Sequence, residues 1–336
     1  MKKVLFLLPI VLCWSCMSNS TTEKYQNKRD NIVDVKEQVK EIVIAEDDVM
    51  ISRLALPYIV NNHLIIVDYK SDDSLIHIFD KNNFEYLISI GRKGQGPGEI
   101  TKVGHLTVDK SCKELFVTDN GKQVIFSFNI DSIFANPLYL PEIKMRMKKN
   151  IFPAQYYYIN DTLSITRAIS PIGNSDYSPS VAKWNMTTDE ITPMSYTHPK
   201  IEKKRITFAV SIEHNLYVEC YSHHDLLSIC DIAGKLRCNV YGPNWNSKKS
   251  NKMRYYDEPI FIKNRILVAY SGNIRLSEER FPTKFLLFDI DGNYIKTIET
   301  GYRISDCCYD EDNNRVVMHL DEEMQFAYLN LEGILE

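Results

Sequence analysis

Long hydrophobic runs, glycine, proline and excess charge of one sign are all scarce in this sequence. The apolar run at residues 4 to 12 is too short to cross a bilayer as a permanent helix. Glycine and proline number 13 each in 336 residues, which excludes a low-complexity chain. The formal net charge of -4 gives no general attraction to nucleic acid or anionic membranes. We therefore expect no nucleic-acid partner, and any charged site must be local.

Recognisable catalytic and metal-binding motifs are missing as well. The sequence has no Walker lysine, nucleophile elbow, His-Glu-x-x-His, EF-hand loop, zinc spacing or repeated Ser-x-Asp-x-Gly box. We therefore expect no metal and no cofactor, and no catalytic residue can be named. A pair of carboxylates of the glycosidase kind stays open, because such residues are far apart in sequence.

What the sequence does contain is a pair of short β patterns that recurs six times. The first is a buried-strand pattern starting at Leu64, Leu115, Leu163, Leu216, Ile266 and Val316, with steps of 51, 48, 53, 50 and 50 residues. The second ends in an aromatic or apolar residue followed by Asp80, Asn129, Asn185, Asp231, Asp289 or Asn330. A period of this length indicates a propeller or a solenoid.

Each interval has room for four short antiparallel strands and their turns, which make one propeller blade. The sequence therefore predicts an all-β, six-bladed β-propeller over residues 35 to 336. The last blade lacks a fourth strand, because the chain ends soon after Asn330. We expect the strand-like residues 41 to 45 to pair as the outermost strand of that blade and to close the ring.

Residues 1 to 16 have the order of an export signal: two lysines, an apolar run and then Cys-Trp-Ser-Cys. A small residue directly before a Cys resembles the bacterial lipoprotein signal, in which that Cys becomes the lipidated first residue. This resemblance predicts a lipid on Cys16 and anchoring at the cell envelope, with no other membrane contact. Cys13 is the poorer candidate because a bulky leucine precedes it, and a plain secretory signal is the alternative. Residues 17 to 34 are polar and are predicted to form a flexible tether.

The segment Gly-Arg-Lys-Gly-Gln-Gly-Pro-Gly-Glu-Ile at residues 91 to 100, followed by Leu-Thr-Val-Asp at 106 to 109, resembles the blade-to-blade connection of NHL-type repeats. It is similar to the six-bladed, TolB-like β-propeller lipoproteins of gut-type Gram-negative bacteria. This resemblance implies a propeller at the cell envelope and no established reaction.

Two polar motifs are predicted to be structural. The glycines at 91, 94, 96 and 98 precede no helix, so they suit a crossover from one blade to the next better than a phosphate site. The cluster His223-His224-Asp225 is predicted to be a polar turn, because adjacent histidines on a strand diverge.

Basic residues concentrate in the connections from the outermost strand of one blade to the innermost strand of the next. All such connections cross the same face of a propeller, so we expect them to form a positive funnel around the channel. The proposed ligand-binding residues are Arg92, Arg146, Arg205 and Arg254, with Tyr156, Trp245 and Tyr255 as stacking surfaces. The loops between the second and third strands of each blade carry acids on the same face. The alternative is therefore that the two sets pair as solvated ion pairs.

These expectations define two functional hypotheses. The first is an envelope-anchored, non-enzymatic binding or scaffold protein that holds a glycan, a peptide, an anionic molecule or an envelope protein on its loop face. The second is a hydrolase or lyase acting on a polysaccharide or peptide at the central funnel. Fold alone does not separate them, because propellers support both functions.

Overall fold

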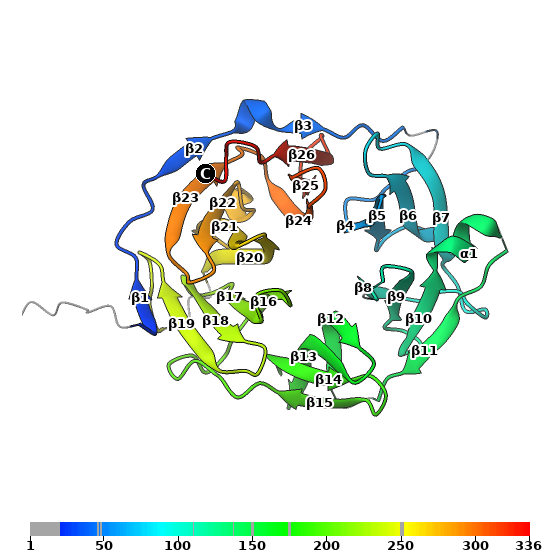
Figure 1. The fold of residues 1–336 in the computed structure, drawn as a ribbon, viewed down its shortest axis with the longest axis horizontal. Helices are drawn as coiled ribbons and strands as arrows, with labels where there is room; N and C mark the ends of the chain where they lie inside the picture. The colour runs from blue at the N-terminus through cyan, green and yellow to red at the C-terminus, as the bar shows by residue number, and fades with distance from the viewer. Residues whose placement is uncertain are drawn as a thin grey trace, which may run out of the picture.

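The protein is a ring of six antiparallel β-sheets arranged around a central axis (Figure 1). The computed structural model describes residues 21–45, 47, 49–109, 111–136, 138–148, 151–173, 176–248 and 252–336. The first strand of each sheet faces the axis, and the last strand lies at the rim of the disk (Figure 1).

Each blade contains four antiparallel strands in consecutive order, except that the last blade takes its outermost strand from the N-terminal part of the chain, and blades 4 and 5 each add a fifth strand from that part. Blades 1 and 2 are built from β4 (Ala55–Val60), β5 (His63–Asp68), β6 (Ser74–Asp80) and β7 (Tyr86–Arg92), and from β8 (Val103–Val108), β9 (Glu114–Asp119), β10 (Val124–Asn129) and β11 (Glu142–Arg146). Blades 3 and 4 are built from β12 (Phe152–Asn160), β13 (Leu163–Ile172), β14 (Asp176–Asn185) and β15 (Glu190–Pro193), and from β16 (Ile206–Ser211), β17 (Leu216–Tyr221), β18 (Leu226–Asp231) and β19 (Leu236–Tyr241). Blades 5 and 6 are built from β20 (Met253–Ile262), β21 (Arg265–Ile274), β22 (Lys284–Asp289) and β23 (Tyr294–Glu299), and from β24 (Ile304–Asp310), β25 (Arg315–Leu320), β26 (Phe326–Asn330) and β3 (Lys40–Glu41). Among the described residues the helices are short: η1 (Lys36–Gln38), α1 (Ile130–Ala135) and η2 (Glu278–Arg280).

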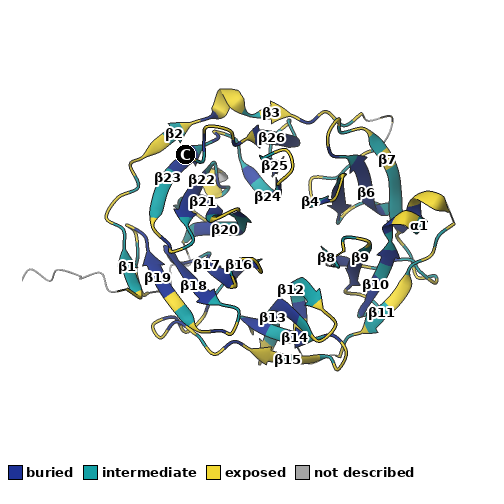
Figure 2. Ribbon diagram, in the orientation of Figure 1, coloured by how far each residue is buried: buried dark blue, intermediate teal, exposed yellow. Residues whose placement is uncertain are grey.

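The hydrophobic core is divided among the interfaces between neighbouring blades. Ile76 of blade 1 packs in one cluster with Val117 of blade 2, and Leu287 of blade 5 packs in another with Val316 of blade 6. The second strands of blades 1 and 2 are covered on both faces, so their apolar residues are consecutive rather than alternating (Figure 2). All six copies of the first repeated pattern of the sequence lie in the second strands of the blades.

The predicted ring closure is confirmed. Strand β3 pairs antiparallel with β26, with Glu41 opposite Ala327 and Lys40 opposite Tyr328. The amide of Ile42 extends the pairing by donating to the carbonyl oxygen of Phe326 at 2.9 Å. The strand is centred slightly before the predicted residues 41 to 45, and it covers the edge of β26.

The prediction of a flexible tether at residues 17 to 34 is wrong for its described part. Strands β1 (Glu23–Tyr25) and β2 (Ile32–Asp34) pair in parallel with β19 and β23 as fifth strands of blades 4 and 5. Residues 21 to 41 therefore wrap around three blades in succession (Figure 1). The segment is polar because its outward face is exposed, while its backbone groups are satisfied by the open edges of the two blades.

The glycine-rich segment is the predicted crossover between blades 1 and 2. Gly91, the residue before the last one of β7, has a φ of +69°, and a bridge joins Lys93 to Ile100. The Glu99 carboxylate accepts a hydrogen bond from the amide of Gly96 at 2.7 Å. A Cβ atom at Gly94 would lie 2.0 Å from that carboxylate, so a side chain there would displace the Glu99 carboxylate from its present position.

No helix among the described residues is both long and apolar enough to cross a membrane.

Candidate functional site

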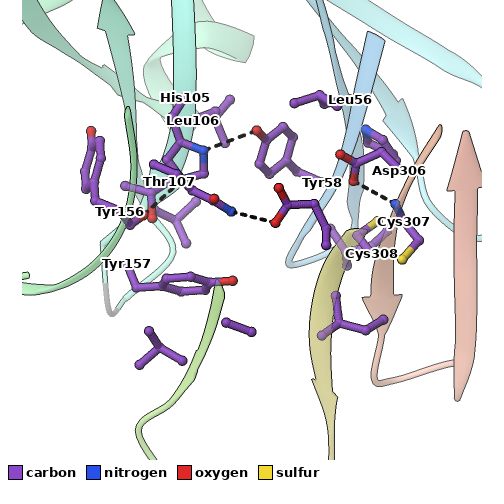
Figure 3. Close-up of a pocket in the computed structure, with 18 of the residues that line it drawn as sticks. Leu56, Tyr58, His105, Leu106, Thr107, Tyr156, Tyr157, Asp306, Cys307 and Cys308 are labelled. Carbon is purple, nitrogen blue, oxygen red and sulfur yellow. Dashed lines mark hydrogen bonds between the residues drawn. The ribbon is translucent and has the colours of Figure 1, made fainter. Parts of the chain in front are cut away.

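A cavity of about 580 Å³ occupies the central channel. Its walls come from the innermost strands β4, β8, β12, β16, β20 and β24 of all six blades, together with Arg167 of β13 and the residues Tyr69, Asn120 and Glu311, which follow β5, β9 and β24. Figure 3 shows part of this wall, including Tyr58, His105 and Asp306. The lining mixes polar residues, such as His105, Gln155 and Asp306, with apolar ones, such as Val60, Val108 and Phe261.

The polar residues sit where four of the inner strands depart from regular pairing. The register shifts at residues 103–106 of β8, 153–155 of β12, 256–259 of β20 and 304–306 of β24. A bulge leaves a residue without a cross-strand partner and turns its side chain out of the normal alternation. His105 and Glu258 are unpaired residues of this kind, and Asp306 directly follows the unpaired Ser305; all three residues line the cavity.

His105 is in β8 of blade 2, and its two ring nitrogens contact Tyr58 of blade 1 and Tyr156 of blade 3. Its Nε2 is 2.9 Å from the carbonyl oxygen of Tyr156, so Nε2 carries the proton in the neutral ring. The Tyr58 hydroxyl points at Nδ1 from 3.5 Å (Figure 3). Burial lowers the pKa of His105 to about 4, so the ring is neutral at physiological pH.

Two carboxylates from blades 5 and 6 make the channel wall acidic. Burial raises the pKa of Glu258, although the charge of Arg167 opposes the shift. Burial, followed by repulsion from Glu258, raises the pKa of Asp306 well above its ordinary value. The side-chain amide of Gln155 donates a long hydrogen bond of 3.4 Å to Glu258. The backbone amide of Cys307 donates a hydrogen bond of 2.7 Å to Asp306. Both groups retain hydrogen-bonding capacity for a ligand.

The channel thiols are weak nucleophiles. Cys307 and Cys308 line the cavity, and burial raises the pKa of both thiols well above the ordinary value. A protonated thiol is a poor nucleophile. Among the described residues, all six cysteines are free, and no group of three or more His, Cys, Asp or Glu side chains is placed to hold a metal ion.

The four arginines predicted to form a positive funnel do not come together at the channel. Arg92 ends the rim strand β7 and lies 3.7 Å from Asp73, with both side chains exposed. Arg146 ends the rim strand β11. Arg254 pairs with Asp257 at 2.5 Å, and Arg205 lines a separate cavity. The predicted convergence is therefore wrong.

The alternative of charge pairing across the face is confirmed for several residues. Lys93 contacts Asp72 at 3.1 Å, and Lys203 contacts Asp176 at 2.8 Å. Arg303 lies 3.2 Å from Glu322. In each pair, a basic residue in a connection between two blades contacts an acidic residue of one of those two blades, between its second and third strands or at the start of the third.

The three predicted stacking residues are already engaged within the fold. Tyr156 is fully buried and packs edge-on against Trp184. Tyr255 is 6% exposed and belongs to the core between blades 4 and 5. Trp245 packs against Tyr241 with ring centroids 4.7 Å apart. Tyr156 is among the residues that line the channel cavity, although its side chain is buried, whereas Tyr255 and Trp245 are not part of that lining.

The predicted polar turn His223-His224-Asp225 is a turn, but it is buried rather than exposed. Asp225 has no exposed surface. Its carboxylate accepts a hydrogen bond of 3.0 Å from Arg29, which lies in the segment between β1 and β2. The Tyr256 hydroxyl donates to the same carboxylate oxygen at 2.8 Å. Asp225 therefore holds the N-terminal segment on the propeller.

Arg167 is a channel residue that the sequence prediction missed, although the repeat carries a signal for it. It stands four residues after Leu163, the place that Asp68 and Asp119 occupy in blades 1 and 2. Those aspartates accept backbone amides of the preceding connection, from Ser52 at 2.8 Å and Thr101 at 2.9 Å. The corresponding residues of blades 4, 5 and 6 are Cys220, Tyr270 and Leu320, so Arg167 is the one cation at this position of the repeat.

Comparisons with known proteins agree with this architecture. A protein-family model described as "6-bladed beta-propeller" (DUF5128) matches residues 26–221. A crystal structure of a DUF4221 family member from Bacteroides vulgatus is similar over 88% of this chain and 98% of its own, with 14% identity and a TM-score of 0.57. The structure of U3-55K covers 83% of this chain and 96% of its own, with 9% identity and a TM-score of 0.55.

A third similar structure is a protein from Bacteroides fragilis described as exported. It covers 89% of this chain and 88% of its own, with 12% identity and a TM-score of 0.52. At these identities the likeness shows the fold alone. No curated protein sequence matches the chain. The family match spans more than half of the sequence and agrees with the observed blades, and the chain therefore belongs to this family of six-bladed β-propellers.

Proposed function

We propose that the protein is an exported, envelope-anchored binding protein that holds an uncharged, hydroxyl-rich ligand, a glycan, in its central channel. The observation that carries the proposal is the pair of half-buried carboxylates, Glu258 and Asp306, on the wall of a 580 Å³ cavity that also presents tyrosine rings. Carboxylates accept hydroxyl groups, and tyrosine rings pack on the apolar faces of sugars. A cavity of this volume is typical of small-ligand sites, which measure roughly 300–1,000 Å³.

The acidic wall argues against an anionic ligand at this position. In their ionised forms Glu258 and Asp306 would repel it, and Arg167 is the cation that balances them on the same wall. The raised pKa values favour a neutral glycan further, because a carboxyl group that protonates readily can donate as well as accept. A peptide, a protein partner and a hydrolysed substrate are the other possible outcomes of the test below.

Replacing Glu258 with Gln is expected to weaken the binding of neutral oligosaccharides by about tenfold, because a hydrogen bond to a charged acceptor is worth roughly 1.5–3 kcal/mol. The measurement is a glycan and peptide screen of the purified protein, followed by calorimetry of the best glycan. Glu190→Gln, on the exposed rim strand β15, is the matched control and should change affinity less than about twofold. Binding of peptides alone, or the release of new reducing ends, would replace this proposal with the corresponding alternative.

Anchoring is part of the same proposal and depends on Cys16, which lies outside the described residues. The lipoprotein-like order of residues 1 to 16 supports it, and export is also the description of the similar Bacteroides fragilis protein.

Replacing Cys16 with Ser should move the protein from a detergent-requiring membrane fraction to the soluble fraction, since acyl chains contribute about 0.8 kcal/mol per buried CH₂. Fractionation followed by immunoblotting measures this shift. Cys13→Ser is the control and should remain in the membrane fraction. Release by Cys13→Ser, with retention of Cys16→Ser, would identify Cys13 as the lipidated residue instead.

A further inference from the structure

A second cavity of about 430 Å³ lies between blades 3 and 4, outside the central channel. It is bounded by the β13–β14 hairpin on one side and by the start of β16 on the other. Its walls are mainly apolar, with Ile169, Pro179 and Ile206 among them, and Arg167 and Arg205 are its charged residues. Arg167 also lines the channel, so the two cavities share this one side chain.

The cavity exists because blade 3 has an unusually long hairpin. Strands β13 and β14 contain ten residues each, whereas the corresponding strands of blade 4 contain six. Their pairing continues to Ile172 opposite Asp176. The added length carries Tyr177 and Pro179 beyond the end of blade 4 and makes one wall of the cavity.

Arg205 is fixed at the edge of this cavity by backbone carbonyls. Its Nη1 donates to the carbonyl oxygens of Tyr177 at 3.0 Å and Lys204 at 3.2 Å. Its Nη2 lies 3.6 Å from one oxygen of Asp176, and Lys203 contacts the other oxygen at 2.8 Å. The guanidinium is therefore oriented, and it shares its one carboxylate with Lys203.

Arg167 is similarly oriented and incompletely bonded. Its Nη1 donates to the carbonyl oxygen of Ile206 at 2.9 Å. Its Nε is buried and has no hydrogen-bond partner among the described residues. Glu258 stands on the channel side of Arg167 and balances its charge only in part, because burial makes Glu258 easier to protonate. Three cations, Arg167, Lys203 and Arg205, thus share two carboxylates, Asp176 and Glu258.

We propose that this cavity binds a carboxylate carried on an apolar body, either a small aromatic or aliphatic acid or the apolar C-terminal residue of a peptide. The two guanidinium groups would hold the carboxylate, since their planar donors match its oxygens. Ile169, Pro179 and Ile206 would receive the apolar part. This site is distinct from the glycan site proposed for the channel, because Arg167 is the only lining residue that the two cavities have in common.

The test uses calorimetry of the purified full-length protein with three probes: N-acetyl-phenylalanine, its uncharged amide, and an acetylated tetrapeptide ending in phenylalanine with a free carboxylate. The acid is expected to bind at least about tenfold more tightly than the amide, because the charge-assisted bonds are lost in the amide. Tighter binding of the tetrapeptide would identify a peptide C-terminus as the ligand source, and preference for the single residue would identify a small acid.

Variants separate this site from the channel and from general electrostatic attraction. Arg205→Gln should lower affinity for the acid at least about tenfold, and Arg205→Lys should give an intermediate loss because charge is kept but the planar fork is not. Arg237→Gln, an exposed change on β19, is the matched control and should leave affinity unchanged. Glu258→Gln should retain the preference for acid over amide even if it abolishes glycan binding. Equal affinity for acid and amide, an equal loss in Arg237→Gln, or no binding of the acid up to about 1 mM would overturn the proposal.

Discussion

Replacing Asp225 with Asn is expected to lower the free energy of unfolding by about 3–5 kcal/mol, the usual cost of removing one partner from a buried ion pair. The Arg29 side chain is 8% exposed and the Asp225 side chain is 0% exposed. Arg29 Nη1 lies 3.0 Å from one carboxylate oxygen, and Nη2 donates to the Tyr256 hydroxyl at 2.7 Å. The variant would leave a guanidinium buried among aromatic rings without a counter-charge. Denaturant unfolding followed by fluorescence measures the loss.

Two further variants show whether the effect belongs to the pair. Arg29→Met combined with Asp225→Asn should recover part of the stability, because no unpaired charge is then buried. Asp30→Asn removes the exposed Lys28–Asp30 pair, 3.0 Å apart, and should leave the unfolding midpoint unchanged. An Asp225→Asn protein as stable as the wild type would mean that the N-terminal segment is not held by this contact.

The architecture was predictable because the repeated segments of the sequence are the buried second strands of the blades. The second strand is buried along most of its length in blades such as 1 and 6, so apolar runs appear at Leu64 and at Val316. The closing strand was predictable because an edge without a partner in the last blade requires one. Strands β1 and β2 left no such trace, since each is three residues long and bonds mainly through its backbone.

The candidate site was predicted less well, and the reason is geometric. A connection between blades crosses the whole radius of the disk, so only residues at its inner end approach the channel. Arg92 and Arg146 are the last residues of the rim strands β7 and β11, which places them far from the axis. The residues that do line the channel, such as His105 and Glu258, lie within inner strands at bulges. Charged residues inside an otherwise apolar inner strand were the available signal.

Contacts between distant segments were beyond prediction from the sequence. Arg29 and Asp225 are separated by 196 residues, and neither belongs to a repeated position that would connect them. Lys81 and Arg315 are a similar case, because they meet only where blade 6 closes against blade 1.

Replacing Asp310 with Asn is expected to destabilise the ring closure by about 3–5 kcal/mol, because Asp310 holds two buried cations at the junction of blades 6 and 1. The carboxylate has no exposed surface and lies 2.9 Å from Arg315 and 3.2 Å from Lys81. The Arg315 guanidinium also lies over the rings of Phe84 and Tyr328, at 4.8 and 5.0 Å from their centroids. Loss of the carboxylate would leave both cations without their buried counter-ion, and denaturant unfolding measures the result.

Asp312→Asn is the matched control, because Asp312 also contacts Lys81 but its side chain is 74% exposed, so its loss should cost at most about 1 kcal/mol. Acid titration gives a second readout. Burial alone would raise the pKa of Asp310, but hydrogen bonds from Asn313 and Lys81, with the charges of Lys81 and Arg315, hold it below its ordinary value of 3.8. A group with a lowered folded pKa stabilises the protein above its ordinary pKa and loses that contribution as pH falls through the folded value. Wild-type stability should therefore decline below pH 3.8 more steeply than that of Asp310→Asn. Parallel acid curves for the two proteins would show that the ring closes without using this carboxylate.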